Sequence, residues 1–155
     1  MSSGSRKTTD HPADTARQVA ILAARVGNEK KATDIIVQEV RETLIICDYF
    51  VIMTGANNRQ VDAIAAAVEE RLRLECALKP LGREGLEELS WVLLDYGEVV
   101  VHIFQPEFRD FYRLENLWSD SPLVDLTAAG LTDLSYSEHI ARLVQGMGQA
   151  GGDRL

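Results

Sequence analysis

The feature that most constrains the fold of this chain is the segment 91–104, in which two apolar, β-branched runs flank a polar turn. The residues of the turn are Asp95, Tyr96, Gly97 and Glu98. This pattern is typical of a β-hairpin. With Tyr96 and Gly97 as a two-residue loop, the register follows by counting outward, and Trp91 is predicted to pair with His102.

Side chains alternate between the two faces of a sheet, so the hairpin has two different faces. One face is purely aliphatic and consists of Val92, Leu94, Val99 and Val101. The other face is aromatic and mixed and consists of Trp91, Leu93, Val100 and His102. We expect the first face to belong to the core. The second face is either another buried face or a surface for a partner, and the pattern leaves both alternatives open.

The remaining periodicities predict an α/β domain with about five strands in a mixed sheet, its last two strands antiparallel, and with helices packed on it. The expected strands are 34–40, 49–54 and 77–81 together with the hairpin, and 82–85 is expected to be a flexible polar loop. The expected helices are 12–27, one that begins after Asn57, and 107–118, with Phe111, Leu114 and Trp118 on the apolar stripe of the last.

The length of 155 residues fits one folded domain, which we expect to span 12–121. Residues 1–11 are polar and are expected to be disordered. Residues 122–155 lack a clear period until a capping-box pattern near Ser135. We therefore expect a C-terminal appendage that is partly disordered, with one short helix over 136–146.

The acidic charge of the chain argues against binding to a nucleic-acid backbone, which depends on Lys and Arg. The net charge is −8. Between Lys79 and Asp125 there are ten acidic and four basic residues, so this segment contributes −6. An acidic surface attracts basic partners and repels phosphate. We also find no signal peptide and no apolar run long enough for a membrane span, so a cytoplasmic protein is expected.

No group of residues in the sequence favours catalysis. The strand–Gly55–helix turn lies where phosphate-binding loops occur, but both glycine-rich phosphate motifs are missing. Cys47 lies among apolar residues, which raise a thiol pKa and make it a poor nucleophile. His102 is interpreted as a packed, hydrogen-bonded histidine. We therefore predict no catalytic residue, no metal and no cofactor. A nucleotide-utilising enzyme similar to nucleotidyltransferases is kept as the alternative.

Several scattered motifs together resemble the ribosomal silencing factor (RsfS/Iojap) family over about residues 13–120. The motifs are Thr54-Gly55, Arg59-Gln60-Val61, Glu84-Gly85, the segment 91–97, the segment 99–102, and 111–115 with Leu117-Trp118. The resemblance implies a fold similar to nucleotidyltransferases without their catalytic carboxylates. Residues 122–155 have no counterpart in this comparison.

The resemblance also implies a function. Such proteins bind the large ribosomal subunit through its protein number fourteen, block joining of the small subunit, and repress translation when nutrients are short. An assembly role on the large subunit is an alternative, and a homodimer through an exposed sheet edge or through the aromatic face stays open. By position, Trp91 and Glu84 match the family's partner-contacting tryptophan and acidic loop residue. We extend the expected partner-binding set to Leu93, Asp95, Tyr96, His102, Arg109 and Tyr112.

Overall fold

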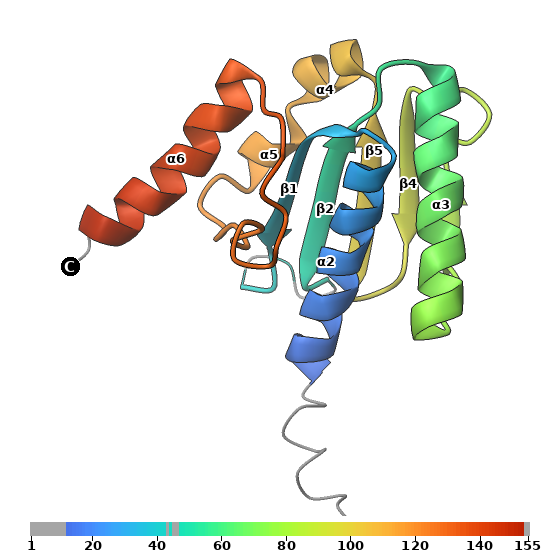
Figure 1. Cartoon of the computed structure of the whole chain (residues 1–155), viewed down its shortest axis with the longest axis horizontal. Coiled ribbons are helices and arrows are strands. Elements are labelled where there is room, and N and C mark those ends of the chain that lie inside the picture. Colours follow the sequence, from blue (N-terminus) through green and yellow to red (C-terminus); the bar gives the residue numbers. More distant parts are fainter. Residues whose placement is uncertain (1–11, 43, 45–46, 154–155) are drawn as a thin grey trace, which may run out of the picture.

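The structure, a computed structural model, describes residues 12–42, 44 and 47–153 (Figure 1). The described residues form a five-stranded sheet in the order β1-β2-β5-β4-β3. The strands are β1 (Thr33–Glu39), β2 (Tyr49–Thr54), β3 (Gly82–Glu84), β4 (Trp91–Asp95) and β5 (Val99–Phe104). β2 and β5 are parallel and all other neighbours are antiparallel. The predicted α/β domain with a mixed five-stranded sheet is confirmed. The expectation for residues 1–11 lies outside the described residues.

Two long helices cover one face of the sheet. They are α2 (Pro12–Glu29) and α3 (Asn58–Cys76), which lie in front of the strands in Figure 1. Their apolar stripes meet the aliphatic face of the hairpin in one buried cluster, in which Val92, Leu94 and Val101 are fully buried. The helix α3 begins at the predicted cap, where the Asn57 side chain accepts a hydrogen bond from the Gln60 N–H.

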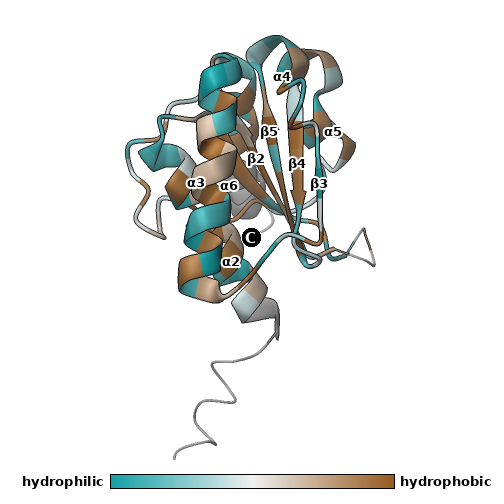
Figure 2. Cartoon of the chain, turned by 90° about the vertical axis from the view of Figure 1, so that its right-hand side faces the viewer, coloured by the Kyte–Doolittle hydropathy of each residue, from teal (hydrophilic) through white to brown (hydrophobic). Residues whose placement is uncertain are grey.

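Shorter elements cover part of the opposite face. They are α4 (Pro106–Tyr112), α5 (Leu114–Leu117) and α6 (Glu138–Asp153). In Figure 2, α5 lies on the side of the sheet away from α3. The second apolar cluster forms beneath these helices, around Phe50, Phe104, Leu114 and Ile140. The domain therefore has three layers, with the sheet in the middle.

The hairpin register differs from the predicted one by two residues. Trp91 pairs with Phe104 rather than with His102, and the loop is Gly97–Glu98 rather than Tyr96–Gly97. The reason is that Tyr96 continues the alternation of β4 and buries its ring with the aliphatic face, where its N–H donates to the Val99 carbonyl. A shift of two residues keeps every side chain on its predicted face.

Two other local predictions are wrong. Residues 77–81 do not form a strand; Ala77 ends α3 in the left-handed region, and the strand is β3, where a flexible loop was expected. The expected helix 107–118 is broken at Arg113, which adopts a φ of 46° between α4 and α5. The break turns Phe111 out of the predicted apolar stripe, and its side chain is 78% exposed.

The segment after residue 121 is packed along the β1 edge of the sheet. Gln38 forms a bridge with Leu123, and the Val124 N–H donates to the Val37 carbonyl. Leu126 and Leu131 are buried in the first apolar cluster. The helix expected over 136–146 spans Glu138–Asp153, and its Ile140 enters the second cluster. The described part of this segment, which was expected to be an appendage, contributes to both apolar clusters.

Candidate functional site

The aromatic face of the sheet is covered over β1, β2 and β5 and is open over β4 and β3. Among the described residues, the buried members of the second cluster come from β1, β2, β5, the connection before β2, and the helices α5 and α6. The corresponding positions on β4, Trp91 and Leu93, are only half-buried. The pairing of β3 with β4 places Glu84 opposite Leu93 on the same face, and Glu84 is exposed.

Aromatic rings extend this opening onto α4. The indole of Trp91 stacks on Phe104 at 4.7 Å between ring centroids and lies 5.0 Å from the ring of Tyr112. The Phe111 ring lies 4.9 Å from that of Tyr112. Tyr112 is 48% exposed and Phe111 is 78% exposed. Side chains from β3, β4 and α4 thus form one surface, which we name the open face: Glu84, Trp91, Leu93, Asp95, Phe111 and Tyr112.

The structure divides the eight residues that were predicted to bind a partner. Glu84, Trp91, Leu93, Asp95 and Tyr112 belong to the open face. Tyr96, His102 and Arg109 are buried, at 9%, 4% and 4% exposure. A side chain buried to this extent cannot contact a partner directly, so these three have to be reinterpreted. Tyr96 belongs to the core beside α3. His102 lies beneath Trp91, and Arg109 lies beneath α4.

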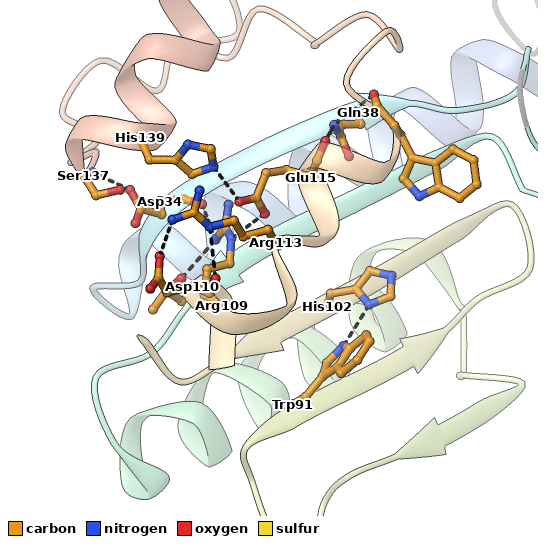
Figure 3. Close-up of polar contacts among 12 residues, drawn as sticks. Asp34, Gln38, Trp91, His102, Arg109, Asp110, Arg113, Glu115, Ser137 and His139 are labelled. Atoms are coloured by element: carbon orange, nitrogen blue, oxygen red, sulfur yellow. Dashed lines mark hydrogen bonds and ion pairs between the residues drawn. The ribbon is translucent and has the colours of Figure 1, made fainter. Parts of the chain in front are cut away.

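His102 supports Trp91 from below. The indole N–H of Trp91 donates to Nδ1 of His102 at 3.1 Å (Figure 3). Burial, together with the nearby charge of Arg109, lowers the pKa of His102 to about 3. The imidazole is therefore neutral near pH 7, with the proton on Nε2 and Nδ1 free to accept the indole N–H. The prediction of a packed, hydrogen-bonded histidine is confirmed.

Arg109 is the centre of a buried polar network beneath α4 (Figure 3). Its guanidinium donates to Glu115 Oε1 at 3.0 Å, to Thr54 Oγ1 at 3.0 Å and to the Asp34 carbonyl at 2.8 Å. Burial lowers the pKa of Arg109, and the adjacent carboxylate of Glu115 opposes this effect. The second carboxylate oxygen of Glu115 contacts His139 Nε2 of α6 at 3.1 Å. Arg109 thus joins the ends of two strands to α5 and α6.

Sequence reasoning missed Phe111 as a surface residue, because it assumed one continuous helix over 107–118. The signal that could have located it is the pair Arg109 and Glu115. Buried charges are usually paired, and six residues of one straight helix would place these two on different sides of the axis. A break in the helix at Arg113 brings both charged side chains to the inner side and leaves Phe111 on the outside.

Acidic side chains border the open face on its β3 side. Glu84, Glu87 and Glu88, on β3 and the turn after it, are all exposed. Arg83, the basic residue next to Glu84, alternates to the other face, where its guanidinium pairs with Glu69 of α3 at 2.8 Å. Arg113, which follows Tyr112, is exposed and pairs with Asp110 at 3.0 Å. The open face thus combines exposed aromatic rings with a negative rim, and such a rim favours a basic partner.

The turn that could have bound phosphate is closed by the protein itself. The carbonyl of the Gln60 side chain accepts from the Ala56 N–H at 2.6 Å, and its amide donates to the Lys30 and Lys31 carbonyls. A phosphate at the start of α3 would have to displace Gln60 from these bonds. The space beside Gly55 is filled as well, because a Cβ added to this glycine would lie 2.9 Å from the Val61 side chain.

In the part of the chain that the structure describes, the other reactive groups do not assemble into a site. Burial raises the pKa of the Cys47 thiol to about 11, which confirms that it is a poor nucleophile. Among the described residues, no group of three His, Cys, Asp or Glu side chains could hold a metal ion. None of the helices within the described residues is long and apolar enough to span a membrane.

Comparison with known proteins gives one consistent family. The family model for "Ribosomal silencing factor during starvation" matches residues 13–143, which extends beyond the limit near residue 120 expected from the motifs. Ribosomal silencing factor RsfS of Bacillus subtilis is 37% identical over 110 residues, which cover 71% of this chain and 92% of the relative. A mouse protein named "Mitochondrial assembly of ribosomal large subunit protein 1" is 32% identical over 111 residues, covering 68% of this chain and 49% of the relative.

Solved structures agree with the fold. A crystal structure of a Chromobacterium violaceum protein has a TM-score of 0.63 and 36% identity, and covers 66% of this chain and 84% of that chain. A Bacillus halodurans structure has a TM-score of 0.57 and 34% identity, and covers 70% of this chain and 94% of that chain.

Proposed function

This chain belongs to the ribosomal silencing factor family, and from this premise we propose that it represses translation by binding the large ribosomal subunit. In this proposal the open face binds protein number fourteen of that subunit, and the bound protein sterically blocks joining of the small subunit when nutrients are limiting. No reaction is performed at the site.

The observation that carries the proposal is the continuity between Trp91 and Tyr112. These two rings lie 5.0 Å apart, come from different elements and are both accessible. Accessible aromatic anchors surrounded by polar groups are the usual hot spots of protein interfaces. The acidic rim around Glu84 supports a basic protein as the partner, since complementary charge increases the association rate and the selectivity.

A role in assembly of the large subunit is the second candidate, and the name of the mouse relative favours it. Both roles use the same binding step, and they differ in whether the partner is a mature or an immature subunit. The nucleotide-utilising enzyme is disfavoured because Gln60 occupies the turn that would hold phosphate. A homodimer through the open face would compete with ribosome binding.

Co-sedimentation tests the proposal. The purified protein is expected to sediment with isolated large subunits and not with assembled ribosomes, and to reduce subunit joining in a light-scattering assay. Combining Trp91→Ala with Glu84→Lys should abolish co-sedimentation while the circular dichroism spectrum stays unchanged. Glu70→Lys is the matched control, because Glu70 is exposed on α3, on the other side of the sheet.

Three outcomes would count against the proposal. Undiminished co-sedimentation of the double variant would remove the open face as the binding site. Selective binding to immature subunits, without inhibition of joining, would favour the assembly role. Heat released on titration with a nucleoside triphosphate and magnesium would revive the enzyme alternative.

A further inference from the structure

The exposed part of the open face rests on two helices that are too short to hold their own position. The helix α4 has seven residues and α5 has four, whereas isolated helices below about 12 residues are marginal in water. Within α4, all of whose residues are described, Arg109 is the only buried one. Contacts made by this guanidinium therefore contribute strongly to where Phe111 and Tyr112 lie.

The helix α6 reaches the same guanidinium through Glu115. One carboxylate oxygen of Glu115 pairs with Arg109 at 3.0 Å and the other contacts His139 at 3.1 Å (Figure 3). Glu115 itself is fully buried, whereas the His139 side chain is 30% exposed. The outermost member of the network thus belongs to the C-terminal helix and can be changed without opening the core.

A second connection runs through Asp34, which adopts a φ of 52° at the irregular start of β1. Its N–H donates to the Ser135 carbonyl at 2.9 Å, and its carboxylate accepts from the Ser137 N–H at 2.6 Å. Its own carbonyl accepts from Arg109 at 2.8 Å. Asp34 and Glu115 therefore both join the start of α6 to Arg109. Such a left-handed conformation costs free energy for any residue with a Cβ, and these contacts offset it.

We propose that α6 acts as a clasp for the open face: through His139, Glu115 and Arg109 it fixes the α4–α5 turn in the orientation that places Tyr112 against Trp91. This inference rests on the proposed function, since it assigns positioning residues to the same binding surface. Arg109 was expected to contact the partner, and in this proposal it acts through the position of α4. The C-terminal helix thereby becomes a determinant of ribosome affinity although it lies outside the contact.

The test uses the full chain with His139→Leu and His139→Gln. Leucine keeps the bulk and the helix propensity but cannot donate to Glu115, whereas the glutamine amide can. For His139→Leu we expect hydrogen exchange of the amides in 106–117 to become about tenfold faster and the affinity for large subunits to fall about three- to tenfold. His139→Gln should restore both values to those of the parent.

Arg142→Leu is the control within α6, because Arg142 is exposed and pairs only with Glu138 among the described contacts. It should change neither quantity. The clasp is refuted if His139→Leu leaves exchange in 106–117 unchanged, if His139→Gln gives no rescue, or if Arg142→Leu has the same effect. It is also refuted if exchange accelerates without loss of affinity while Trp91→Ala still weakens binding.

Failure of the proposed function gives a different result. If Trp91→Ala and Tyr112→Ala both bind large subunits like the parent, the open face is not the ribosome-binding surface. The exchange measurement then still decides whether His139 positions the α4–α5 turn, because it needs no ribosome.

Discussion

The indole N–H of Trp91 donates to Nδ1 of His102 at 3.1 Å, although these two residues are diagonal rather than paired neighbours on adjacent strands. The bond joins the half-exposed anchor of the open face to a histidine that is 4% exposed. It fixes both the tautomer of the imidazole and the orientation of the indole. A buried neutral histidine thus holds the surface residue on which partner binding is proposed to depend.

Protonation of His102 should make the stability of the protein depend on pH. Its pKa is lowered from 6.5 to about 3 in the folded protein, so below pH 6.5 the unfolded chain binds a proton that the folded chain does not. Its contribution to stability is therefore constant above pH 6.5 and is lost as the pH falls, by up to about 1.4 kcal/mol per pH unit.

Urea unfolding of the parent and of His102→Phe between pH 7.5 and pH 4.5 measures this contribution. As the pH falls, the free energy of unfolding should decrease more steeply in the parent. Above pH 7 the difference between the two proteins should no longer change with pH. Parallel curves over the whole range would mean that His102 titrates normally in the folded state.

A methyl group at Gly85 should disturb the open face. Gly85 has a φ of +85°, and an added Cβ would lie 2.0 Å from the Trp91 carbonyl oxygen. We expect Gly85→Ala to lower the free energy of unfolding by about 2 kcal/mol or more, from positive-φ strain and displacement of β4. The matched control is Gly82→Ala, where the added Cβ would meet no atom closer than 3.9 Å. Equal melting temperatures for both variants would contradict this explanation.

Much of the fold could be predicted from the sequence because its strands and long helices have strong periods. The strand Tyr49–Thr54 and the Asn57 cap agree with the structure residue by residue. The errors lie where tertiary contacts decide. Tyr96 extends β4 because its ring finds room in the core beside α3, and a hairpin pattern alone does not contain this information.

The buried pair Arg109–Glu115 should be strongly coupled. Both side chains are 5% exposed or less, so removing one partner leaves an uncompensated buried charge. We expect Arg109→Met and Glu115→Gln each to lower the free energy of unfolding by about 3 kcal/mol or more. The double variant should lose clearly less than the sum of the two, and a double-mutant cycle in urea measures the difference. Additive losses would show that the two charges do not interact.

The candidate site was only partly predictable for a related reason. Alternation along β4 correctly placed Trp91 and Leu93 on one face, and the pairing with β3 adds Glu84 to it. Burial of Arg109, in contrast, depends on Thr54, Asp34 and Glu115, which are distant in the sequence or beyond the break at Arg113. A charged residue in a predicted interface was therefore interpreted as a contact, although its side chain is buried in this network.

The affinity of the protein for the isolated large-subunit protein number fourteen tests the central claim most directly. It should be measured for the parent, for Tyr112→Ala on the open face and for Leu74→Ala, whose side chain is 61% exposed on α3 on the opposite side. The account predicts about tenfold or greater loss of affinity for Tyr112→Ala and parental affinity for Leu74→Ala. Equal affinity for all three proteins, or a loss confined to Leu74→Ala, would contradict it.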